Sequence, residues 1–416
     1  MKLGVDLGPL RSSPQFRRLY FARFYSGIGN QMTYVVTAYQ LRLLTHSTLA
    51  VGSLGLVEVI PILVLGLYGG VLADHLDRRV MVVTTEVVLG VLSVALLVNT
   101  LWHPHAWVLY VVDALVVSAG SLQTPSLVAM RRLIVRHDEQ RAAATLGAIR
   151  DTTATLVAPA VGGLLAVLAG PATAYVVTVV AFGVSVPMLA SLQRPPRGGG
   201  EGDVVTSLRE GLRYTRSRPD LLGTYLVDLL AMAWAYPVIM LPFVAATFRQ
   251  RDALALLYMG LPLGSMLATL SAGWARHVRR YGRAIVAAAA VWGLGIALFG
   301  FANSLALDMV GLVIAGGADG LSGIFRTTMW NESIPPDVRG RLAGVELISY
   351  ALGPTTGQLR SGWMAAWWTL RASLGVGGLV ATASVGAVAA SVKRLWSFDA
   401  RHDPHVAEVA RLRGAA

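Results

Sequence analysis

Charged side chains inside long apolar stretches are the residues of this sequence whose chemistry stands out. Seven carboxylates and four arginines interrupt segments that are otherwise almost entirely hydrophobic. An ionised group in the hydrocarbon of a membrane is costly, so such residues usually face a partner or an aqueous cavity and mark ion or substrate pathways. The carboxylates are Glu58, Glu86, Asp113, Asp151, Asp228, Asp319 and Glu346, and the arginines are Arg23, Arg150, Arg326 and Arg360.

The depth of each carboxylate in its apolar segment suggests its role. Glu86 and Glu346 lie within about six residues of a segment end, roughly 9 Å at the helical rise of 1.5 Å per residue. We expect these two side chains to reach the membrane surface or to cap a helix. Glu58, Asp151 and Asp319 lie nearer the middle of their segments, where both a functional and a structural role fit the sequence.

The spacing of charges along the chain predicts which of them pair. Asp319 and Arg326 lie on one helix face but two turns apart, roughly 10 Å, so direct pairing requires a leaning side chain or a bridging group. Arg150 and Asp151 are adjacent, and we expect them to point in different directions and to have separate partners. Three glycines next to Asp319 are expected to leave room for ligand or water; they are Gly316, Gly317 and Gly320.

Aromatic and flexible side chains near these charges suggest the wall of a substrate cavity. Two prolines, Pro237 and Pro242, lie in one apolar segment, where proline allows a membrane helix to bend. Methionine beside aromatic rings forms an adaptable surface for a bulky apolar ligand; ordinary helix packing and an interfacial aromatic belt are the alternative. The candidate cavity residues are Arg23, Tyr34, Asp228, Met232, Trp234, Tyr236 and Arg326.

Enzymatic chemistry finds no support in the sequence. Its only lysines are Lys2 and Lys393, so a phosphate-binding Gly-x-x-x-x-Gly-Lys-(Ser/Thr) loop is absent. The chain has no cysteine, and its eight histidines fall in predicted loops or tails. For His103-Pro104-His105 we favour a turn over a metal site. We therefore expect no enzyme activity, no cofactor and no bound metal.

The segments that position these residues are membrane spans. The 416-residue chain is 55% hydrophobic and only 14% charged, with mean hydropathy +0.59, whereas an ordinary soluble domain has about 25% charged residues. Twelve apolar segments have about the 20 residues that a spanning helix needs. They are residues 19–42, 49–73, 80–101, 106–129, 142–169, 171–192, 221–248, 253–275, 284–304, 306–329, 342–366 and 372–392.

Basic residues predict the orientation of these spans. With the N-terminus inside the cell, 27 of the 35 basic residues fall on the cytoplasmic side, 4 outside and 4 within spans. Cytoplasmic loops carry such an excess of Lys and Arg, so both termini are expected in the cytoplasm of a multi-pass plasma (inner) membrane protein. This bias also explains the net charge of +12 without a nucleic-acid partner.

A polar segment divides the chain into two halves. Residues 194–200 read as a flexible linker, and an amphipathic helix on the inner membrane surface is expected from Asp203 onwards. The predicted parts are a six-helix half (1–192), a cytoplasmic linker (193–220), a second six-helix half (221–392) and a cytoplasmic tail (393–416).

Short motifs recur in the two halves. After the second span comes a loop that contains Gly70, Asp74, Arg78 and Arg79. The stretch from Gly273 to Arg283 has the same place after the eighth span. Pro159, Gly162 and Gly163 in the fifth span correspond to Gly353, Pro354 and Gly357 in the eleventh, and we expect both sets to serve helix packing. A parallel repeat of two six-helix halves is one way in which secondary transporters are built.

Several of these motifs together resemble the enterobactin exporter family of the major facilitator superfamily. The loop from Gly70 to Arg79 resembles the superfamily loop Gly-x-x-x-Asp-(Arg/Lys)-x-Gly-Arg-(Arg/Lys), although His75 and Asp77 replace the usual basic residue and glycine. Asn30 stands where many drug-efflux relatives carry an acidic residue. The other matching stretches are residues 22–24, 44–52, 158–163, 207–214, 317–326 and 336–341.

This resemblance implies an all-α membrane transporter with alternating access. It implies export of a bulky amphipathic small molecule, such as a siderophore, drug or secondary metabolite, by proton antiport, and a monomer surrounded by lipid. Helix ten lines the cavity in this superfamily, which makes Asp319 the first candidate for proton coupling, followed by Glu58, Asp151 and Asp113. An importer of the same fold and a non-transporting receptor or scaffold are the alternatives.

Overall fold

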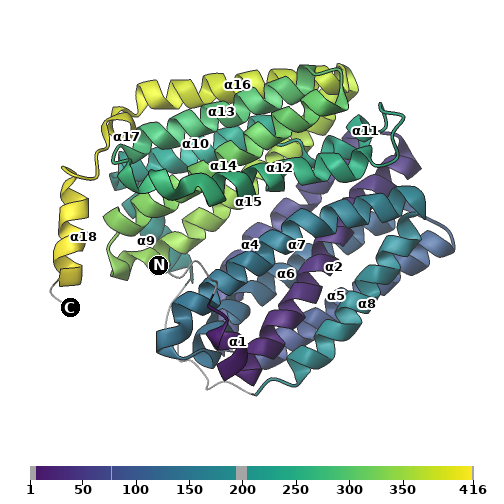
Figure 1. Ribbon diagram of the computed structural model, residues 1–416, viewed down its shortest axis with the longest axis horizontal. Coiled ribbons are helices and arrows are strands. Elements are labelled where there is room, and N and C mark those ends of the chain that lie inside the picture. Colours follow the sequence, from purple (N-terminus) through teal and green to yellow (C-terminus); the bar gives the residue numbers. More distant parts are fainter. Residues whose placement is uncertain (1–5, 76, 194–203, 415–416) are drawn as a thin grey trace. The chain divides into compact units, whose positions relative to one another are not determined.

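The computed structural model describes residues 6–75, 77–193 and 204–414; side chains are not described at residues 67–75, 132, 204, 205, 207, 336, 337 and 343. Within these ranges all regular structure is helical (Figure 1). The first half of the chain contains α1 (Gly8–Ser12), α2 (Pro14–Thr45), α3 (Thr48–Gly52), α4 (Leu54–His75), α5 (Arg78–Leu101), α6 (Ala106–Ile134), η1 (His137–Glu139), α7 (Gln140–Leu168) and α8 (Pro171–Ala190). The second half contains α9 (Val204–Ser217), α10 (Pro219–Ala235), η2 (Val238–Met240), α11 (Leu241–Ala245), α12 (Ala253–Ser271), η3 (Ala272–His277), α13 (Tyr281–Phe301), α14 (Leu305–Ser333), α15 (Pro336–Trp367), α16 (Leu370–Ser391), α17 (Lys393–Ser397) and α18 (Pro404–Gly414).

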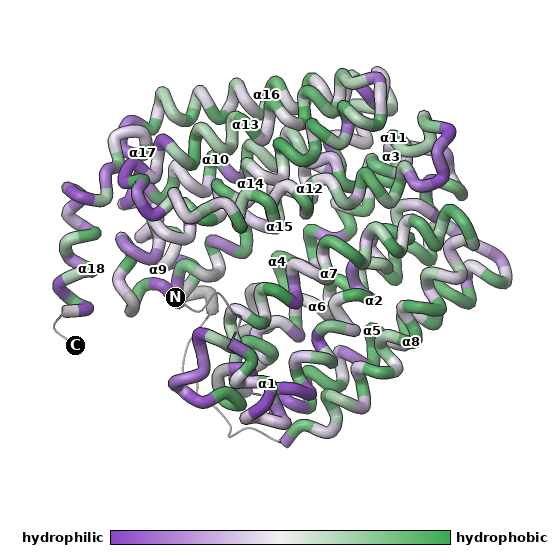
Figure 2. The backbone as a smooth tube through the Cα atoms, viewed as in Figure 1, coloured by the Kyte–Doolittle hydropathy of each residue, from purple (hydrophilic) through white to green (hydrophobic). Residues whose placement is uncertain are grey.

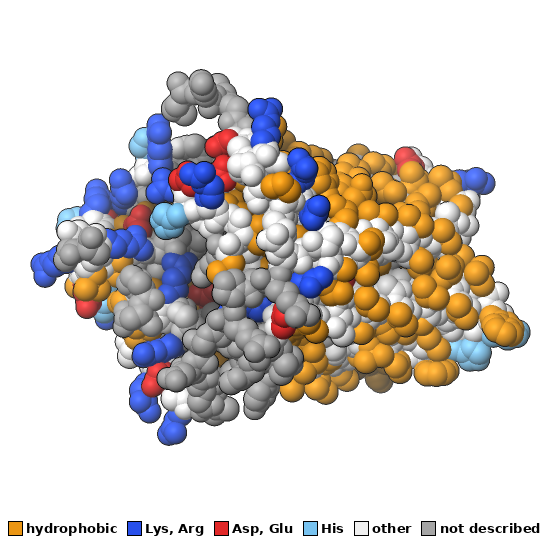
Figure 3. Space-filling model, turned by 90° about the horizontal axis from the view of Figure 1, so that it is seen from below, with side chains coloured by type: hydrophobic (Ala, Val, Ile, Leu, Met, Phe, Trp, Pro, Cys, Tyr) orange, Lys and Arg blue, Asp and Glu red, His pale blue; other side chains and the backbone are white. Residues whose placement is uncertain are grey.

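Ten helical segments of the described chain are long and apolar enough to cross a membrane. The helices α2 and α15, where the first and eleventh spans are predicted, have 32 residues each but are not among the ten, because charged and polar side chains lower their mean hydropathy. Hydrophobic residues lie mainly in the long helices, and hydrophilic residues lie mainly in the segments that connect them (Figure 2). On the face in Figure 3, apolar side chains form a broad surface beside which Lys and Arg gather.

The chain forms two compact units that are not continuous in sequence. Unit 1 comprises Met1–His46, Ile60–Gly202 and Gln250–Ala255. Unit 2 comprises Ser47–Val59, Asp203–Arg249 and Leu256–Ala416. The start of α4 therefore belongs to unit 2 and the rest of that helix to unit 1.

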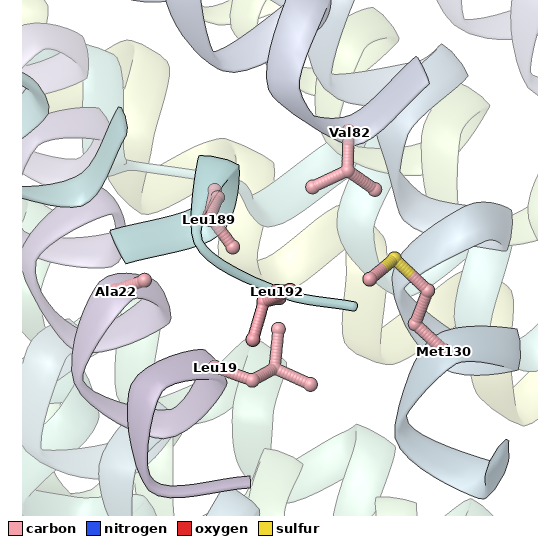
Figure 4. Packing of buried hydrophobic residues seen from close by; sticks show 6 residues of the cluster. All are labelled: Leu19, Ala22, Val82, Met130, Leu189 and Leu192. Carbon is pink, nitrogen blue, oxygen red and sulfur yellow. The ribbon is translucent and has the colours of Figure 1, made fainter. Parts of the chain in front are cut away.

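Unit 1 is held together by apolar packing between its long helices. The helix α2 packs against α7 and α8, and α5 packs against α6 and α8. One cluster of fully buried side chains joins α2, α5, α6 and the end of α8; its members, in Figure 4, are Leu19, Ala22, Val82, Met130, Leu189 and Leu192. In a water-soluble protein, burying a leucine, valine or methionine side chain typically contributes about 1.5–3 kcal/mol. Between membrane helices, close van der Waals packing stabilises the contact instead.

Unit 2 brings helices together through glycines. The helix α13 packs against α14 and α16, and α10 against α15 and α16. A methyl group on Gly264 of α12 would lie 2.7 Å from the backbone nitrogen of Gly317 in α14. Small residues let membrane helices approach this closely, so α12 and α14 are in backbone contact.

The predicted span 221–248 corresponds to the candidate membrane span Pro219–Ala245, which is not one continuous helix. The helix α10 ends at Ala235, and Tyr236 is extended, with φ −92° and ψ 109°. Pro237 follows, and proline disfavours helical geometry at the residue before it. The chain then continues as the short η2 and α11, so this segment is bent at Tyr236 and Pro237.

The predicted amphipathic helix after the linker is present as α9, and it packs against α15. Gly211 and Thr215 are buried at this contact, whereas Leu212 is 38% exposed. The small Gly211 lets α9 approach the backbone of Arg341. Arg341 also pairs with Glu210 at 3.2 Å.

Candidate functional site

A buried group of three charges lies between α10 and α14 in unit 2. Arg326 forms an ion pair with Asp228, and its other terminal nitrogen lies 3.9 Å from a carboxylate oxygen of Asp319. The side chains of Arg326 and Asp228 are 5% and 7% exposed, whereas that of Asp319 is 40% exposed. The prediction that Asp319 and Arg326 do not pair closely is consistent with the long contact, since the arginine leans towards Asp228.

Aromatic residues surround this charged group. The guanidinium of Arg326 lies 5.6 Å from the ring centre of Tyr350, within the range of a cation–π interaction. Trp330 lies next to both Tyr350 and Tyr225, and its indole nitrogen donates a hydrogen bond of 3.1 Å to the hydroxyl of Thr224. These rings limit the access of water to Arg326.

Two of the three glycines beside Asp319, Gly316 and Gly320, do not leave the expected room. A methyl group on Gly316 would lie 2.6 Å from the carbonyl carbon of Leu261, and one on Gly320 would lie 2.8 Å from the hydroxyl of Ser265. Both neighbours belong to α12, so the space is filled by the backbone of that helix. Gly316 and Gly320 serve helix contact instead, whereas Gly317 lines an apolar pocket of about 670 Å³ between α12, α13 and α14.

A second polar group is buried in unit 1. Arg23 donates a hydrogen bond of 3.0 Å to Gln123, and the amide nitrogen of Gln123 donates one of 2.6 Å to Glu86. Ser185 donates a further hydrogen bond to Glu86, which is 0% exposed. The expectation that Glu86 reaches the membrane surface is therefore wrong, because three helices supply polar partners around it.

The prediction that Arg150 and Asp151 have separate partners is also wrong. Two guanidinium nitrogens of Arg150 donate hydrogen bonds of 2.9 and 2.8 Å to one oxygen of Asp151. The arginine side chain is long enough to fold back along α7, and its guanidinium also lies 5.8 Å from the ring centre of Tyr20. Arg23, Arg150 and Asp151 line one pocket of about 280 Å³.

The remaining candidates for proton coupling, Glu58 and Asp113, belong to different units. Glu58 is buried near the start of α4, in the part that belongs to unit 2. Asp113 of α6 is buried in unit 1, close enough to Tyr175 to interact with it electrostatically. The hydroxyl of Tyr175 donates a hydrogen bond of 2.9 Å to Gln40. Tyr34 is half-buried on α2.

The predicted aromatic and methionine cavity residues in and directly after α10 lie against α15. Met232 and Tyr236 contact α15, where methyl groups on Gly353 and Gly357 would each lie 2.8 Å from their β-carbons. The ring centre of Trp234 lies 6.0 Å from the guanidinium of Arg360, which also belongs to α15. Two of the three aromatic or methionine candidates thus contribute to helix packing.

The predicted packing motifs lie at contacts between helices. A methyl group on Gly162 of α7 would lie 3.2 Å from the side chain of Met32 in α2. Pro159 and Gly163 are buried on the same helix, and Pro354 lies within α15 between Gly353 and Gly357. These positions permit close approach without contributing side-chain chemistry.

The predicted switch loop is described only in part. The side chains of Gly70 and Asp74 lie outside the described residues, although both positions belong to α4. Asp77 caps α5, because its carboxylate accepts hydrogen bonds from the backbone of Arg79 and of Val80. The side chain of Arg79 donates to the carbonyl of Ala190 at the end of α8, and Arg78 is the first residue of α5.

Comparison with known proteins identifies the family. A family model described as Major Facilitator Superfamily matches residues 19–358. The chain belongs to the major facilitator superfamily. It is therefore a multi-pass membrane transporter and not an enzyme.

Relatives of this transporter include proteins described as enterobactin exporters. One from Shigella boydii serotype 18 is 27% identical over 379 residues, which cover 90% of this chain and 91% of the relative. One from Escherichia coli O139:H28 is 28% identical over 379 residues, with the same coverage. The predicted resemblance to this family is thereby confirmed.

Solved structures share the transporter's fold. The nucleoside transporter NupG superposes with a TM-score of 0.70 at 13% identity, covering 93% of this chain and 100% of NupG. A POT family transporter in complex with 5-aminolevulinic acid superposes with a TM-score of 0.73 at 13% identity, covering 93% of this chain and 99% of that transporter. At this identity the likeness establishes the fold and says nothing about the substrate.

Sequence reasoning did not single out Gln123, Ser185, Tyr350 or Arg131. Gln123 and Ser185 are uncharged and so do not stand out as ionisable groups do, although a glutamine inside an apolar span is itself unusual. Tyr350 is one of 13 tyrosines, and its place beside Arg326 depends on how α14 and α15 pack. Arg131 was counted as a loop residue, whereas it is the last residue of a candidate span.

Proposed function

We propose that this transporter exports a bulky amphipathic small molecule of the siderophore, drug or secondary-metabolite type by proton antiport with alternating access. The observation that carries the proposal is the group formed by Asp228, Arg326 and Asp319. Its two carboxylates share one guanidinium, so the group has a net charge of −1 with both ionised and is neutral when one carries a proton.

Within this group the two carboxylates have different roles. Asp228 is buried and makes the direct ion pair, which favours its ionised form. Asp319 is more exposed and lies at the limit of contact, at 3.9 Å, so it is the member that exchanges a proton with water. A carboxylate that alternates between protonated and ionised states inside a membrane protein is what proton relays in pumps and transporters use.

The relatives support export as the direction of transport. Enterobactin exporters align with 90% of this chain, which favours export over import. The aromatic surroundings of Arg326 suit a substrate with rings, because aromatic faces and guanidinium groups stack on one another. The proposal includes a monomer in the plasma (inner) membrane with both termini in the cytoplasm.

Transport by purified protein in proteoliposomes tests the proposal. Enterobactin is the first substrate to load, and its gradient-driven movement is compared with exchange of labelled for unlabelled substrate at equal pH. For Asp319→Asn we expect loss of gradient-driven transport and retained exchange, because only the first requires a proton to be carried.

Glu58→Gln is the matched comparison, since Glu58 is another carboxylate of unit 2, buried and on a different helix. We expect it to keep both activities. If Asp319→Asn retains full gradient-driven transport, Asp319 does not carry the proton, and Glu58, Asp151 and Asp113 are then tested in turn. Substrate movement down the proton gradient into the compartment that protons enter would identify an importer instead. Absence of both gradient-driven movement and exchange for every substrate tried would favour a receptor or scaffold.

A further inference from the structure

The pocket in unit 1 combines basic side chains with an apolar lining. It lies between α2, α6 and α7, and three arginines and one carboxylate reach it: Arg23, Arg131, Arg150 and Asp151. Its apolar lining includes Phe16, Leu19, Leu127 and Val128. Its volume of about 280 Å³ is just below the usual range of ligand pockets, about 300–1,000 Å³. It therefore has room for one ring-sized group, not for a whole bulky compound.

Two of the three arginines have nearby carboxylates. Arg150 is hydrogen-bonded to Asp151. Arg23 is joined through Gln123 to Glu86, and Glu86, Arg150 and Asp151 all lie close enough to Arg23 to interact with it electrostatically. The charges of these four residues cancel.

Arg131 is the cation that remains. Its side chain is only partly exposed, lines the pocket and reaches Gly147 of α7, where a methyl group would lie 3.6 Å from a guanidinium nitrogen. No ion pair joins it to a carboxylate within the described residues. With Arg131 included, the set carries one positive charge that no described side chain neutralises.

We infer that this pocket binds the anionic group of the transported compound, a carboxylate, phosphate or ionised phenol carried on an aromatic or aliphatic body. Arg131 and Arg23 would hold the anion, since guanidinium groups form strong charge-assisted hydrogen bonds with such oxygens. The apolar lining would cover the attached ring. The inference rests on the proposed function and narrows it, because the substrate must carry at least one acidic arm.

The structure predicts opposite effects for two changes in the pocket. Arg131→Gln removes the positive charge that is not neutralised. The Kd of an anion should therefore rise by about tenfold, the effect of losing one charge-assisted hydrogen bond. Asp151→Asn removes a negative charge and releases Arg150, so the same anion should bind severalfold more tightly. General damage to the fold would weaken binding in both variants.

Binding of 2-naphthoate to the purified full-length protein tests the inference, with uncharged 2-naphthamide of the same shape as the comparison. The protein is placed in nanodiscs of phosphatidylcholine, and binding is measured by equilibrium dialysis. We expect binding of naphthoate and not of naphthamide. Arg136→Gln is the control variant, because Arg136 is 74% exposed, pairs with Asp138 and lies outside the pocket.

Three results would overturn the inference: equal binding of naphthoate and naphthamide, unchanged naphthoate binding in Arg131→Gln, or weaker binding in Asp151→Asn. A fourth is loss of naphthoate binding when phosphatidylglycerol replaces part of the phosphatidylcholine, since the pocket would then belong to a lipid headgroup. The transport assay stays separate. If the protein transports its substrate but Arg131→Gln does not change naphthoate binding, only the proposed site is rejected. If naphthoate binds with the expected pattern but no substrate is transported, only the proposed function is rejected.

Discussion

Replacing Asp228 with asparagine should destabilise the protein far more than the same change at Asp319. Asp228→Asn removes the carboxylate that pairs directly with Arg326, whose side chain is 5% exposed. Removing one partner of a buried ion pair typically costs about 3–5 kcal/mol, because the other charge stays buried without compensation. Asp319 remains 3.9 Å away and offsets part of this loss, so we expect about 3 kcal/mol.

Asp319→Asn leaves the direct pair intact. Its side chain is 40% exposed and its contact with Arg326 is long, which resembles a surface pair worth about 0–1 kcal/mol. The double variant should lose more than the sum of the two single losses, since Arg326 then has no carboxylate within 4.0 Å among the described residues. Coupling between such neighbours is typically about 0.5–3 kcal/mol.

The free energy of unfolding is measured in mixed micelles by titration with denaturing detergent, followed by circular dichroism. Asp308→Asn is the control, because Asp308 forms an independent pair with Arg371 through hydrogen bonds of 2.8 and 2.9 Å. Its loss should add to that of Asp228→Asn. Equal stabilities of Asp228→Asn and the wild type, or a larger loss in Asp319→Asn, would refute the assignment of the direct pair. Rescue of Asp228→Asn by Arg326→Gln would support it, since no buried charge then lacks a partner.

Further predictions concern orientation, the switch loop and helix packing. Gly199 lies outside the described residues but within the predicted cytoplasmic linker, so a cysteine placed there in this cysteine-free chain should resist an impermeant external reagent in intact cells; rapid labelling would reverse the orientation. Asp74→Asn should preserve folding and ligand binding but slow transport and favour the inward-open state, measured by initial efflux rates and distances between spin labels; unchanged rates and distances would remove the role of the loop. Gly264→Ala should cost about 1–3 kcal/mol of stability, the usual effect of overpacking, because its methyl group would lie 2.7 Å from the nitrogen of Gly317, whereas Gly323 has no neighbour within 4 Å. Gly323→Ala should therefore be neutral or stabilising by up to about 1 kcal/mol, and equal effects at both positions would contradict the close contact of α12 and α14.

Membrane spans and their approximate ends can be predicted from the sequence because they depend on local composition. The predicted segments 106–129 and 171–192 correspond to α6 and α8 with small shifts at their ends. The bend after α10 is also local in origin, since Pro237 follows Tyr236, but the sequence alone does not say whether proline bends a membrane helix or ends it.

The family resemblance can also be predicted from the sequence, because short motifs are read directly from the residues. The orientation, the division into halves and the assigned sites remain predictions. So do the direction of transport and the proton-coupling residue, since these depend on states and gradients that no single sequence position encodes.

The partners of the buried charges were decided by tertiary structure. Asp228 and Arg326 are 98 positions apart in the numbering, and only the packing of α10 near α14 makes them an ion pair. Glu86 was misjudged for the same reason, because its partners Gln123 and Ser185 come from two other helices. Arg150 and Asp151 were misjudged for the opposite reason: adjacent Cβ atoms diverge on a helix, but a long arginine side chain can fold back.

The glycines beside Asp319 show the same division between sequence and structure. The sequence determines that Gly316, Gly317 and Gly320 have no side chain, and both an open cavity and a close helix contact follow from that fact. The backbone of α12 fills the space at Gly316 and Gly320. Local composition determines which segments enter the membrane, whereas the contacts of a buried group depend on neighbours that are distant in sequence and are set by the packing of whole helices.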